Sequence, residues 1–422
     1  MNHLPATSKR IAILSLDTRG GVQPYIALAL GLQRAGHHVQ MIAPADFVPL
    51  VESYGIWVSG LTGSIEAALR GASGAPEKGQ FASMQFARRE SARHVALWVR
   101  EALDACDGVD VITGGIGGMI VGESVAERLG VPFVQSHLQP VCAPTSEYPG
   151  VLFPGVPRWL GGIGRRLSHM ASELALWTPF SAAIRAARRD VLDLPPEKKR
   201  SDFSMPVLYG YSTHVVPRPA TWSASRLVTG YWSLPHRSDW EVEPALDEFI
   251  RSGPPPVCIG FGSMSSADPV SLTRLVVDAV RQVGVRAVLL SGWGGLSESS
   301  HRDLFVMRDA PHDWLFPRMS AVVHHGGAGT TAAACAAGVP SLVVPFTMDQ
   351  PFWASRIEAL GVGPMPIPRQ RLTADRLAAG IHDAITNEAI RGRARALGEC
   401  IRSECGVDVA VSAFESMQIP TR

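Results

Sequence analysis

Short apolar runs alternate with amphipathic stretches along this chain, and the first such unit lies at its start. Residues 11–16 (IAILSL) form an apolar run typical of a strand buried on both faces. A loop follows, and residues 25–35 carry apolar side chains at helical spacing, with Gly36 placed as a C-terminal cap. Residues 37–44 (HHVQMIAP) predict the next strand. The pattern therefore predicts a strand–loop–helix–strand unit.

The second half of the chain repeats this order. Residues 256–261 predict a strand, 270–284 an amphipathic helix and 285–292 another strand. Such alternation implies parallel sheets with right-handed crossovers. We predict an α/β fold with two Rossmann-like, doubly wound parallel-sheet domains that face a central cleft. Ligands would bind at the carboxyl ends of the strands.

Turn-rich segments suggest the domain boundaries. The region before residue 256 is rich in Trp, Pro and Ser and ends in SGPPPV, which favours a linker. The expected division is an N-terminal domain of residues 1–232, a linker of 233–255, a C-terminal domain of 256–400, and a C-terminal helical segment of 401–422 that packs back on the first domain.

Composition narrows the functional classes. The chain has 422 residues, of which 46% are hydrophobic, and a formal net charge of +1. Lys and Arg form no long run, so nucleic acid is not an expected partner. The six cysteines show no zinc-binding spacing, so we expect no metal site. No signal peptide or long apolar stretch appears, which predicts a cytoplasmic protein without a transmembrane segment.

A glycine loop in the second half is the most informative motif. Residues 321–325 (AVVHH) predict a strand and 330–338 a helix, and the four residues between them are Gly, Gly, Ala and Gly. Free N–H groups and the helix dipole attract an anion at such a point. His325 and Thr330 can each add a hydrogen bond. The loop lacks the lysine of a triphosphate-binding loop, which disfavours ATP or GTP hydrolysis. A tight turn without a ligand is the competing interpretation.

A second small-residue turn follows the first strand of the same half. Gly262 and Ser263 come directly after residues 256–261. Strands of one parallel sheet end at the same edge, so both loops are expected to open on one crevice. Their combined span suits a diphosphate.

Several motifs together resemble the nucleotide-sugar domain of family-one glycosyltransferases. They are FGSM, SGWGGL, HHGGAGTT, GVPSLVVPFTMDQPFWASRI and ALGVGP, in the order of the family. VVPRPATW, VTGYW and RGGVQPYIALALGLQRAGH fit the branch of sterol and lipid glucosyltransferase-like enzymes and their bacterial natural-product relatives. The resemblance implies the GT-B arrangement of two domains. It also implies an inverting transfer that needs no bound metal.

The resemblance implies a role for each matching position. The donor's diphosphate would be held by His325, Gly327, Gly329, Thr330 and Ser263. Asp349 and Gln350 would bind the sugar hydroxyls, and a carboxylate beside a carboxamide offers the acceptors and donors that a polyol needs. Ala310, Pro311 and His312 would hold the nucleotide base. Trp293 is a candidate wall of the donor pocket, although a core or interface role is an alternative.

The catalytic base is where this sequence departs from the family pattern. Relatives place Asp or His in the loop after the first strand, and this chain has Gly21 at that position. Asp17 lies four residues earlier, and His137 follows an apolar run that predicts a strand end at the same edge. Either side chain would serve as a general base. The competing role for Asp17 is a cap of the turn or a partner for Arg19, and that for His137 is lining of the acceptor pocket. A third possibility is an acceptor acidic enough to need no base. We favour Asp17 slightly over His137.

The acceptor region is expected within residues 140–170, a long, proline-rich and apolar segment. Tyr148, Phe153 and Trp159 would suit a flat, apolar acceptor. Residues 184–192 (IRAARRDVL) carry three arginines, which favours a solvated helix face, with weak peripheral membrane contact as an alternative.

These observations predict an inverting glycosyltransferase. It would move a hexose from a UDP- or dTDP-sugar, which is a co-substrate, to a sterol, polyketide, aromatic or lipid acceptor, without a cofactor and as a monomer or homodimer. One alternative is a catalytically impaired protein of the same fold that binds nucleotide sugar or activates another transferase. A nicotinamide-dependent oxidoreductase is a third class, but residues 113–130 lack the GxGxxG spacing.

Overall fold

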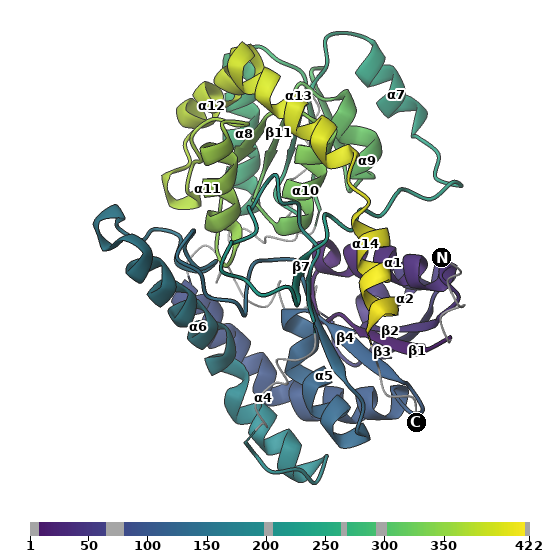
Figure 1. The fold of residues 1–422 in the computed structure, drawn as a ribbon. Coiled ribbons are helices and arrows are strands. Elements are labelled where there is room, and N and C mark those ends of the chain that lie inside the picture. Colours follow the sequence, from purple (N-terminus) through teal and green to yellow (C-terminus); the bar gives the residue numbers. More distant parts are fainter. Residues whose placement is uncertain (1–7, 65–79, 198–205, 263–267, 293–301, 418–422) are drawn as a thin grey trace, which may run out of the picture.

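Two parallel sheets form the framework of the molecule (Figure 1). The computed structural model describes residues 8–64, 80–197, 206–262, 268–292 and 302–417. The first sheet has seven strands in the order β3-β2-β1-β4-β5-β6-β7, and the second has five in the order β10-β9-β8-β11-β12. All of their pairings are parallel, as the alternating pattern predicted. The predicted α/β fold class is confirmed.

The strands are short and mostly buried, because helices cover both faces of each sheet. Those of the first sheet are β1 Arg10–Leu14, β2 His38–Pro44, β3 Trp57–Leu61, β4 Val111–Gly114, β5 Phe133–His137, β6 Val207–Tyr209 and β7 Arg226–Val228. Those of the second are β8 Val257–Gly260, β9 Ala287–Leu290, β10 Leu304–Met307, β11 Ala321–His324 and β12 Ser341–Val343.

The helices connect these strands. In the first half they are α1 Arg19–Arg34, α2 Val48–Glu52, α4 Gln80–Ala105, α5 Ile116–Leu129 and α6 Gly161–Asp190. In the second half they are α7 Pro244–Arg251, α8 Pro269–Val283, α9 His312–Leu315, α10 Ala328–Ala337, α11 Gln350–Leu360, α12 Ala374–Thr386, α13 Glu388–Arg402 and α14 Gly406–Ser416. Short 3-10 turns occur at Ala45–Phe47, Arg158–Leu160, Phe316–Arg318 and Arg369–Arg371.

The strand order places the site. β1 pairs with β2 on one side and with β4 on the other, and Ile11 lies opposite both Val39 and Val111. In the second sheet β8 has the same central position, between β9 and β11. The chain reverses its winding direction at each central strand, so a crevice opens beyond that strand's carboxyl end. The loops after β1, β8 and β11 therefore meet in the middle of the molecule.

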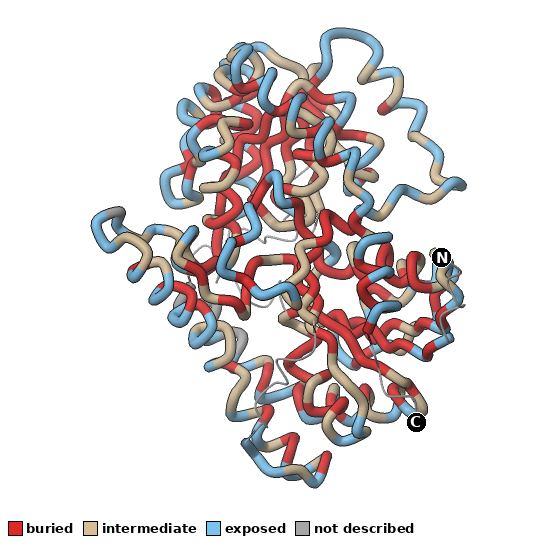
Figure 2. The backbone as a smooth tube through the Cα atoms, in the orientation of Figure 1, coloured by how far each residue is buried: buried red, intermediate tan, exposed pale blue. Residues whose placement is uncertain are grey.

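The buried side chains follow the two sheets, as the red parts of the tube in Figure 2 show. The predicted helix ends after residues 35 and 337 are confirmed, since Gly36 and Gly338 take the left-handed conformation with φ of 90° and 72°. The segment 233–255 includes the short helix α7, whose Leu246 is fully buried.

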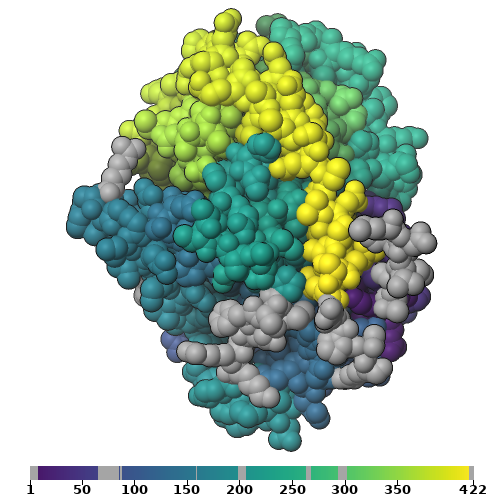
Figure 3. All heavy atoms as spheres, in the orientation of Figure 1, coloured from purple at the N-terminus to yellow at the C-terminus, as the bar shows by residue number. Residues whose placement is uncertain are grey.

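The chain returns to the first sheet at its end. Figure 3 shows the yellow C-terminal segment running from one half of the molecule to the other. Its last helix, α14, packs on α1, and Ala410 and Phe414 belong to the same buried cluster as Leu28 and Leu32. Gly31 of α1 permits the close approach, because a Cβ at that position would lie 2.3 Å from a methyl group of Val407.

Candidate active site

The glycine loop joins β11 to α10 and exposes the start of that helix. Gly326 has a φ of 89°, which a residue with a side chain rarely adopts. The Nδ1 atom of His324 accepts the Gly326 N–H at 3.1 Å and so fixes the turn. Gly327 is the N-cap of α10 and has no side chain that could accept hydrogen bonds from the first turn. The first N–H groups of the helix are therefore left to face the crevice. This geometry suits an anion.

His325 lies between two glycines. A Cβ at Gly262 would lie 2.8 Å from its Cε1 atom, and one at Gly327 would lie 2.5 Å from its Nε2 atom. The ring is buried, and its Nδ1 atom has no hydrogen-bond partner within the described ranges. Burial, together with His312, lowers the pKa of His325 to about 4, so the ring is neutral at pH 7. A buried polar atom without a partner beside a helix N-terminus fits a ligand with acceptor oxygens.

The segment after β10 brings the three predicted base-binding residues together. Ala310 is buried, and Pro311 is the N-cap of α9. The ring of His312 stacks on Phe316 with a centroid separation of 4.3 Å. Burial lowers the pKa of His312 to about 4, so this ring is also neutral at pH 7. A flat, uncharged surface of this kind suits a nucleotide base.

Asp349 and Gln350 lie at the start of α11, and the structure gives them different surroundings. Asp349 accepts hydrogen bonds from Trp353 Nε1 at 2.9 Å and from Gln139 Nε2 at 3.3 Å. Gln139 follows β5, so the second of these bonds crosses the crevice. The Oε1 atom of Gln350 accepts the N–H groups of Phe346 and Thr347, at 2.8 and 3.1 Å. The side-chain oxygen of Gln350 therefore fixes the turn before α11.

Asp17 fills the space beside Gly21. A Cβ built on Gly21 would lie 2.3 Å from Asp17 Oδ2 and 2.2 Å from its Cγ atom. The Oδ1 atom accepts the Thr18 N–H at 2.7 Å. Burial, and to a smaller extent the nearby Asp349 carboxylate, raises the pKa of Asp17 to about 6. The carboxylate therefore occupies the volume that a side chain at position 21 would need.

The loops of the two halves touch at this point. A Cβ on Gly329 would lie 2.9 Å from the carbonyl oxygen of Gly20. Arg19, beside Gly20, forms an ion pair with Asp309, which precedes the base-binding segment. The carboxylate of Asp17, the start of α10 and the segment after β10 thus belong to one site.

His137 has a different environment. Its side chain is fully buried at the end of β5, its ring lies 5.7 Å from that of Tyr209, and its Nε2 atom lies 3.2 Å from Gln135 Oε1. Burial lowers the pKa of His137 to about 3. So weakly basic a group is a poor proton acceptor at neutral pH, because general bases work best with a pKa near the working pH. The environments of the two candidates favour Asp17.

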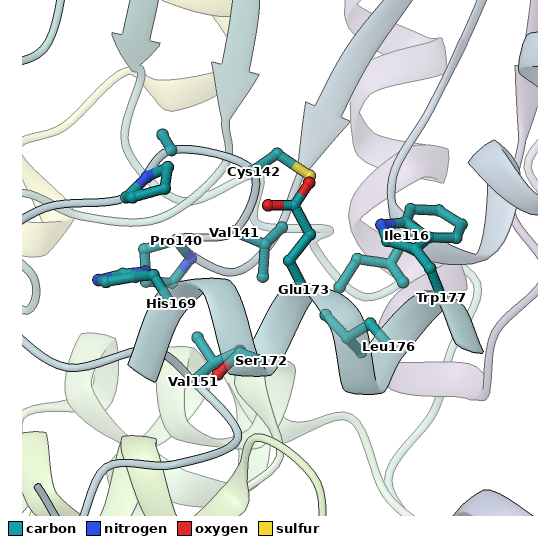
Figure 4. A pocket seen from close by; sticks show the side chains of 12 residues that line it. Ile116, Pro140, Val141, Cys142, Val151, His169, Ser172, Glu173, Leu176 and Trp177 are labelled. Carbon is teal, nitrogen blue, oxygen red and sulfur yellow. The ribbon is translucent and has the colours of Figure 1, made fainter. Parts of the chain in front are cut away.

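The candidate acceptor residues are separated. Tyr148 is buried against Phe352 and His169, with ring centroids 6.2 and 5.7 Å away. Phe153 and Trp159 are 39% and 83% exposed, and neither lines the nearby hollow (Figure 4). Only Tyr148 of the three lies in the interior between the domains.

The hollow of Figure 4 lies between α6 and the segment after β5. Its lining includes residues that the sequence reading did not single out, and Glu173 extends toward Cys142 across it. Cys142 has a φ of 60°, an unusual conformation for a residue with a side chain. A proline on each side of residues 141–143 was the only sequence signal of an irregular turn.

Two predicted site residues, Ser263 and Trp293, lie outside the described residues. Within the described ranges, no three His, Cys, Asp or Glu side chains gather as metal ligands. Nor does any helix in those ranges have the length and apolar character needed to cross a membrane.

Solved structures define the class of fold. The spinosyn rhamnosyltransferase SpnG aligns with a TM-score of 0.68 over 96% of this chain and 100% of that one, at 17% identity. SsfS6, a glycosyltransferase of Streptomyces sp. SF2575 complexed with thymidine diphosphate, aligns with a TM-score of 0.65 over 97% of this chain and 100% of that one, at 17% identity. The predicted GT-B arrangement of two facing domains is confirmed.

Sequence comparisons define the family. Residues 305–413 match the family model described as erythromycin biosynthesis protein CIII-like, C-terminal domain. A sterol 3-beta-glucosyltransferase of Arabidopsis thaliana is 34% identical over 96% of this chain and 67% of the plant protein. That of Neosartorya fischeri is 34% identical over 98% of this chain, which spans 30% of the fungal protein. The chain belongs to the glycosyltransferase family that includes the sterol 3-beta-glucosyltransferases.

Proposed function

We propose that this protein is an inverting glycosyltransferase that moves a hexose from a UDP- or dTDP-sugar to the hydroxyl group of an apolar acceptor. The observation that carries this proposal is the position of the Asp17 carboxylate. It lies in the first domain, near Asp349 of the second and beside the start of α10. A proton acceptor, a polar contact for a sugar and an anion site therefore share one crevice.

The donor is held by the second domain in this proposal. The N–H groups at the start of α10 and the ring of His325 bind the diphosphate, and the segment 310–312 holds the base. Asp349 accepts hydrogen bonds from sugar hydroxyls, in exchange for the bond it now receives from Gln139. Gln350 acts mainly through the backbone turn that its side-chain oxygen fixes. Ser263 and Trp293 stay predictions from the family resemblance.

The transfer follows from this arrangement. Asp17 takes the proton of the acceptor hydroxyl as its oxygen attacks the anomeric carbon. The bond from that carbon to the diphosphate oxygen breaks, and the nucleoside diphosphate leaves with the electron pair. The helix start and His325 stabilise the negative charge that develops on the diphosphate. Attack from the face opposite the leaving group inverts the configuration at the anomeric carbon.

The acceptor is apolar in this proposal. The names of the plant and fungal relatives point to a sterol, and the names of the bacterial structures point to natural products. Tyr148 lies buried between the domains and supports an apolar acceptor. The hollow beside α6 has an apolar lining but a volume of only about 10 Å³, so an acceptor would have to open it. Phe153 and Trp159 lie too far outside to add to this pocket in the present arrangement.

Product analysis tests the proposal. The purified chain is incubated with UDP-glucose or dTDP-glucose and a panel of sterol, polyketide and phenolic acceptors, with and without a chelator, and the products are identified by mass spectrometry. We expect a hexosylated acceptor of inverted configuration whose yield the chelator does not change. Donor binding without any transfer would support the alternative, an impaired protein or an activator of another transferase. The absence of a side chain at Gly21 is the sequence feature that favours this alternative.

A further inference from the structure

The N-terminal half of α6 carries an unusual exposed apolar surface. Ile163, Leu167, Met170 and Leu174 are 75%, 57%, 60% and 70% exposed. Their spacing of four, three and four residues places them on one face of the helix. Trp159, in the turn just before α6, is 83% exposed and extends the same region. We call the four helix residues and Trp159 the α6 stripe.

The helix that carries the stripe is packed against the rest of the protein through its other face. The opposite face of α6 is already anchored, because Ser168 and Ser172 accept the N–H groups of Gly150 and Leu152. His169 makes a further contact there, with Nε2 3.0 Å from the carbonyl oxygen of Tyr148. Figure 1 shows α6 along the outer edge of the molecule, with its N-terminal end away from both sheets. The stripe therefore faces outward while the helix is held from behind.

Exposed arginines lie along the helix that carries the stripe. Of the six arginines between Val151 and Arg189, two are already compensated. Arg188 is buried and pairs with Glu127, and Arg189 pairs with Asp190. Glu173, an acidic residue of this stretch, is exposed, and Figure 4 shows its carboxylate turned toward Cys142. Arg166 and Arg185 are exposed on the same helix, and Arg88 and Arg89 line the groove between α4 and α6.

We propose that the α6 stripe docks the protein on an anionic lipid membrane. Apolar side chains that include a tryptophan, flanked by arginines, are the features of a helix that lies in the membrane interface. The apolar stripe would enter the lipid, and the arginines would pair with anionic headgroups. A second copy of the chain is a poorer occupant, because a two-fold contact through this face would bring the same arginines together.

The position of the stripe gives the contact a role. The hollow beside Tyr148 lies against the opposite face of the same helix, where His169, Ser172 and Leu176 line it. A lipid acceptor that leaves the membrane at α6 would meet this hollow on the far face of the same helix, and the hollow, about 10 Å³ in volume, would have to open to admit it. This delivery role rests on the proposed function, whereas the docking does not.

Vesicle co-sedimentation tests the docking. The full chain is mixed with vesicles of phosphatidylcholine, with and without phosphatidylglycerol, at low and high salt. We expect binding to the anionic vesicles that weakens with salt. In the variant Ile163→Gln/Leu167→Gln/Leu174→Gln the affinity for vesicles should fall about tenfold or more, because three apolar side chains no longer enter the lipid. The matched control Val270→Gln/Met365→Gln/Val409→Gln changes equally exposed apolar residues elsewhere and should bind as the parent does.

A charge variant keeps the test decisive. Arg166→Glu/Arg185→Glu leaves the apolar stripe unchanged and should abolish the preference for anionic vesicles. Equal vesicle binding by all variants would overturn the proposal, as would a parent chain that binds no vesicles. A parent that light scattering shows as a dimer, with the stripe variant monomeric and neither bound to vesicles, would assign the stripe to a second copy instead.

Nucleotide binding separates this proposal from the proposed function. UDP and dTDP affinities are measured by calorimetry on the parent and on each variant. A chain that binds vesicles but neither nucleotide would refute the proposed transferase and leave the docking surface intact. A chain that transfers sugar to a water-soluble acceptor and binds no vesicles would refute only the docking surface.

Discussion

The two sides of the crevice are built in different ways. The proposed donor side consists of tight turns between short buried strands and helix starts, where glycines, His325 and the side-chain oxygen of Gln350 fix the backbone. The acceptor side consists of a long helix, a proline-rich segment and a hollow lined by scattered side chains. Turns fixed by backbone hydrogen bonds tolerate little change, whereas a surface of side chains can be altered residue by residue.

Asp17→Asn tests the junction of the two sides and should have the largest effect. We expect turnover of a hydroxyl acceptor to fall about a hundredfold or more, with donor affinity retained, because the carboxamide cannot take the proton. In the parent, transfer should fall about tenfold per pH unit below about pH 6, since the base is then protonated. Rates are measured against pH, with the exposed Asp104→Asn as control. A large loss in His137→Ala and none in Asp17→Asn would contradict this assignment.

His325→Ala removes a side chain from the donor side. We expect the binding of UDP or dTDP to weaken by about 1–3 kcal/mol, the range for a hydrogen bond to a charged group. Calorimetry measures this loss, and His382→Ala, which changes an exposed histidine on α12, is the control. An unchanged dissociation constant would remove His325 from the site.

Gly21→Ala tests the packing of the base itself. The added methyl group would overlap the Asp17 carboxylate, so we expect the carboxylate to move and the turnover to fall about tenfold or more. Gly20→Ala is the matched control, because a Cβ at Gly20 meets no atom within 4 Å. The exchange Asp17→Gly/Gly21→Asp should recover part of the activity by returning the carboxylate to the usual position. Equal rates in both alanine variants would show that the Asp17 position is not critical.

The last prediction concerns the stability of the fold. The folded protein raises the pKa of Asp17 above its ordinary value, so it binds this proton more tightly than the unfolded chain does. The contribution of protonated Asp17 to the free energy of unfolding is fully present below about pH 4 and is lost as the pH rises through about 6. At pH 7 the buried, ionised carboxylate lowers the stability of the fold. Asp17→Asn should therefore stabilise the fold at pH 7 by about 1–3 kcal/mol. Denaturant unfolding checks this. A loss of stability in the variant would indicate instead that the Asp17 carboxylate stabilises the turn through its hydrogen bond from the Thr18 N–H.

The sequence predicted the fold class well, because it depends on local patterns. Apolar runs, helix spacing and glycine positions define the strands and turns before any tertiary contact is known, and their alternation predicts parallel sheets. The sequence also placed Gly338 at the end of α10, where a left-handed residue ends the helix.

Other features depend on contacts between distant residues. The pattern could not show that the Gln350 side-chain oxygen is bound to the backbone, or that Gln139 reaches Asp349 from the other domain. It could not separate Asp17 from His137, because their pKa values depend on burial and neighbours. Nor could it show that Trp159 lies outside, since an aromatic residue in an apolar loop suits a pocket and a surface equally.

The last helix of the chain has a consequence for biosynthesis. α14 consists of 11 residues, and its Ala410 and Phe414 complete the apolar cluster around α1. The ribosome synthesises α1 almost four hundred residues before α14. Part of the interior of the first domain therefore stays uncovered until the final helix is synthesised. A nascent chain of this protein therefore exposes an apolar surface throughout the synthesis of its second domain. A stop codon before residue 406 would make that exposure permanent and favour aggregation.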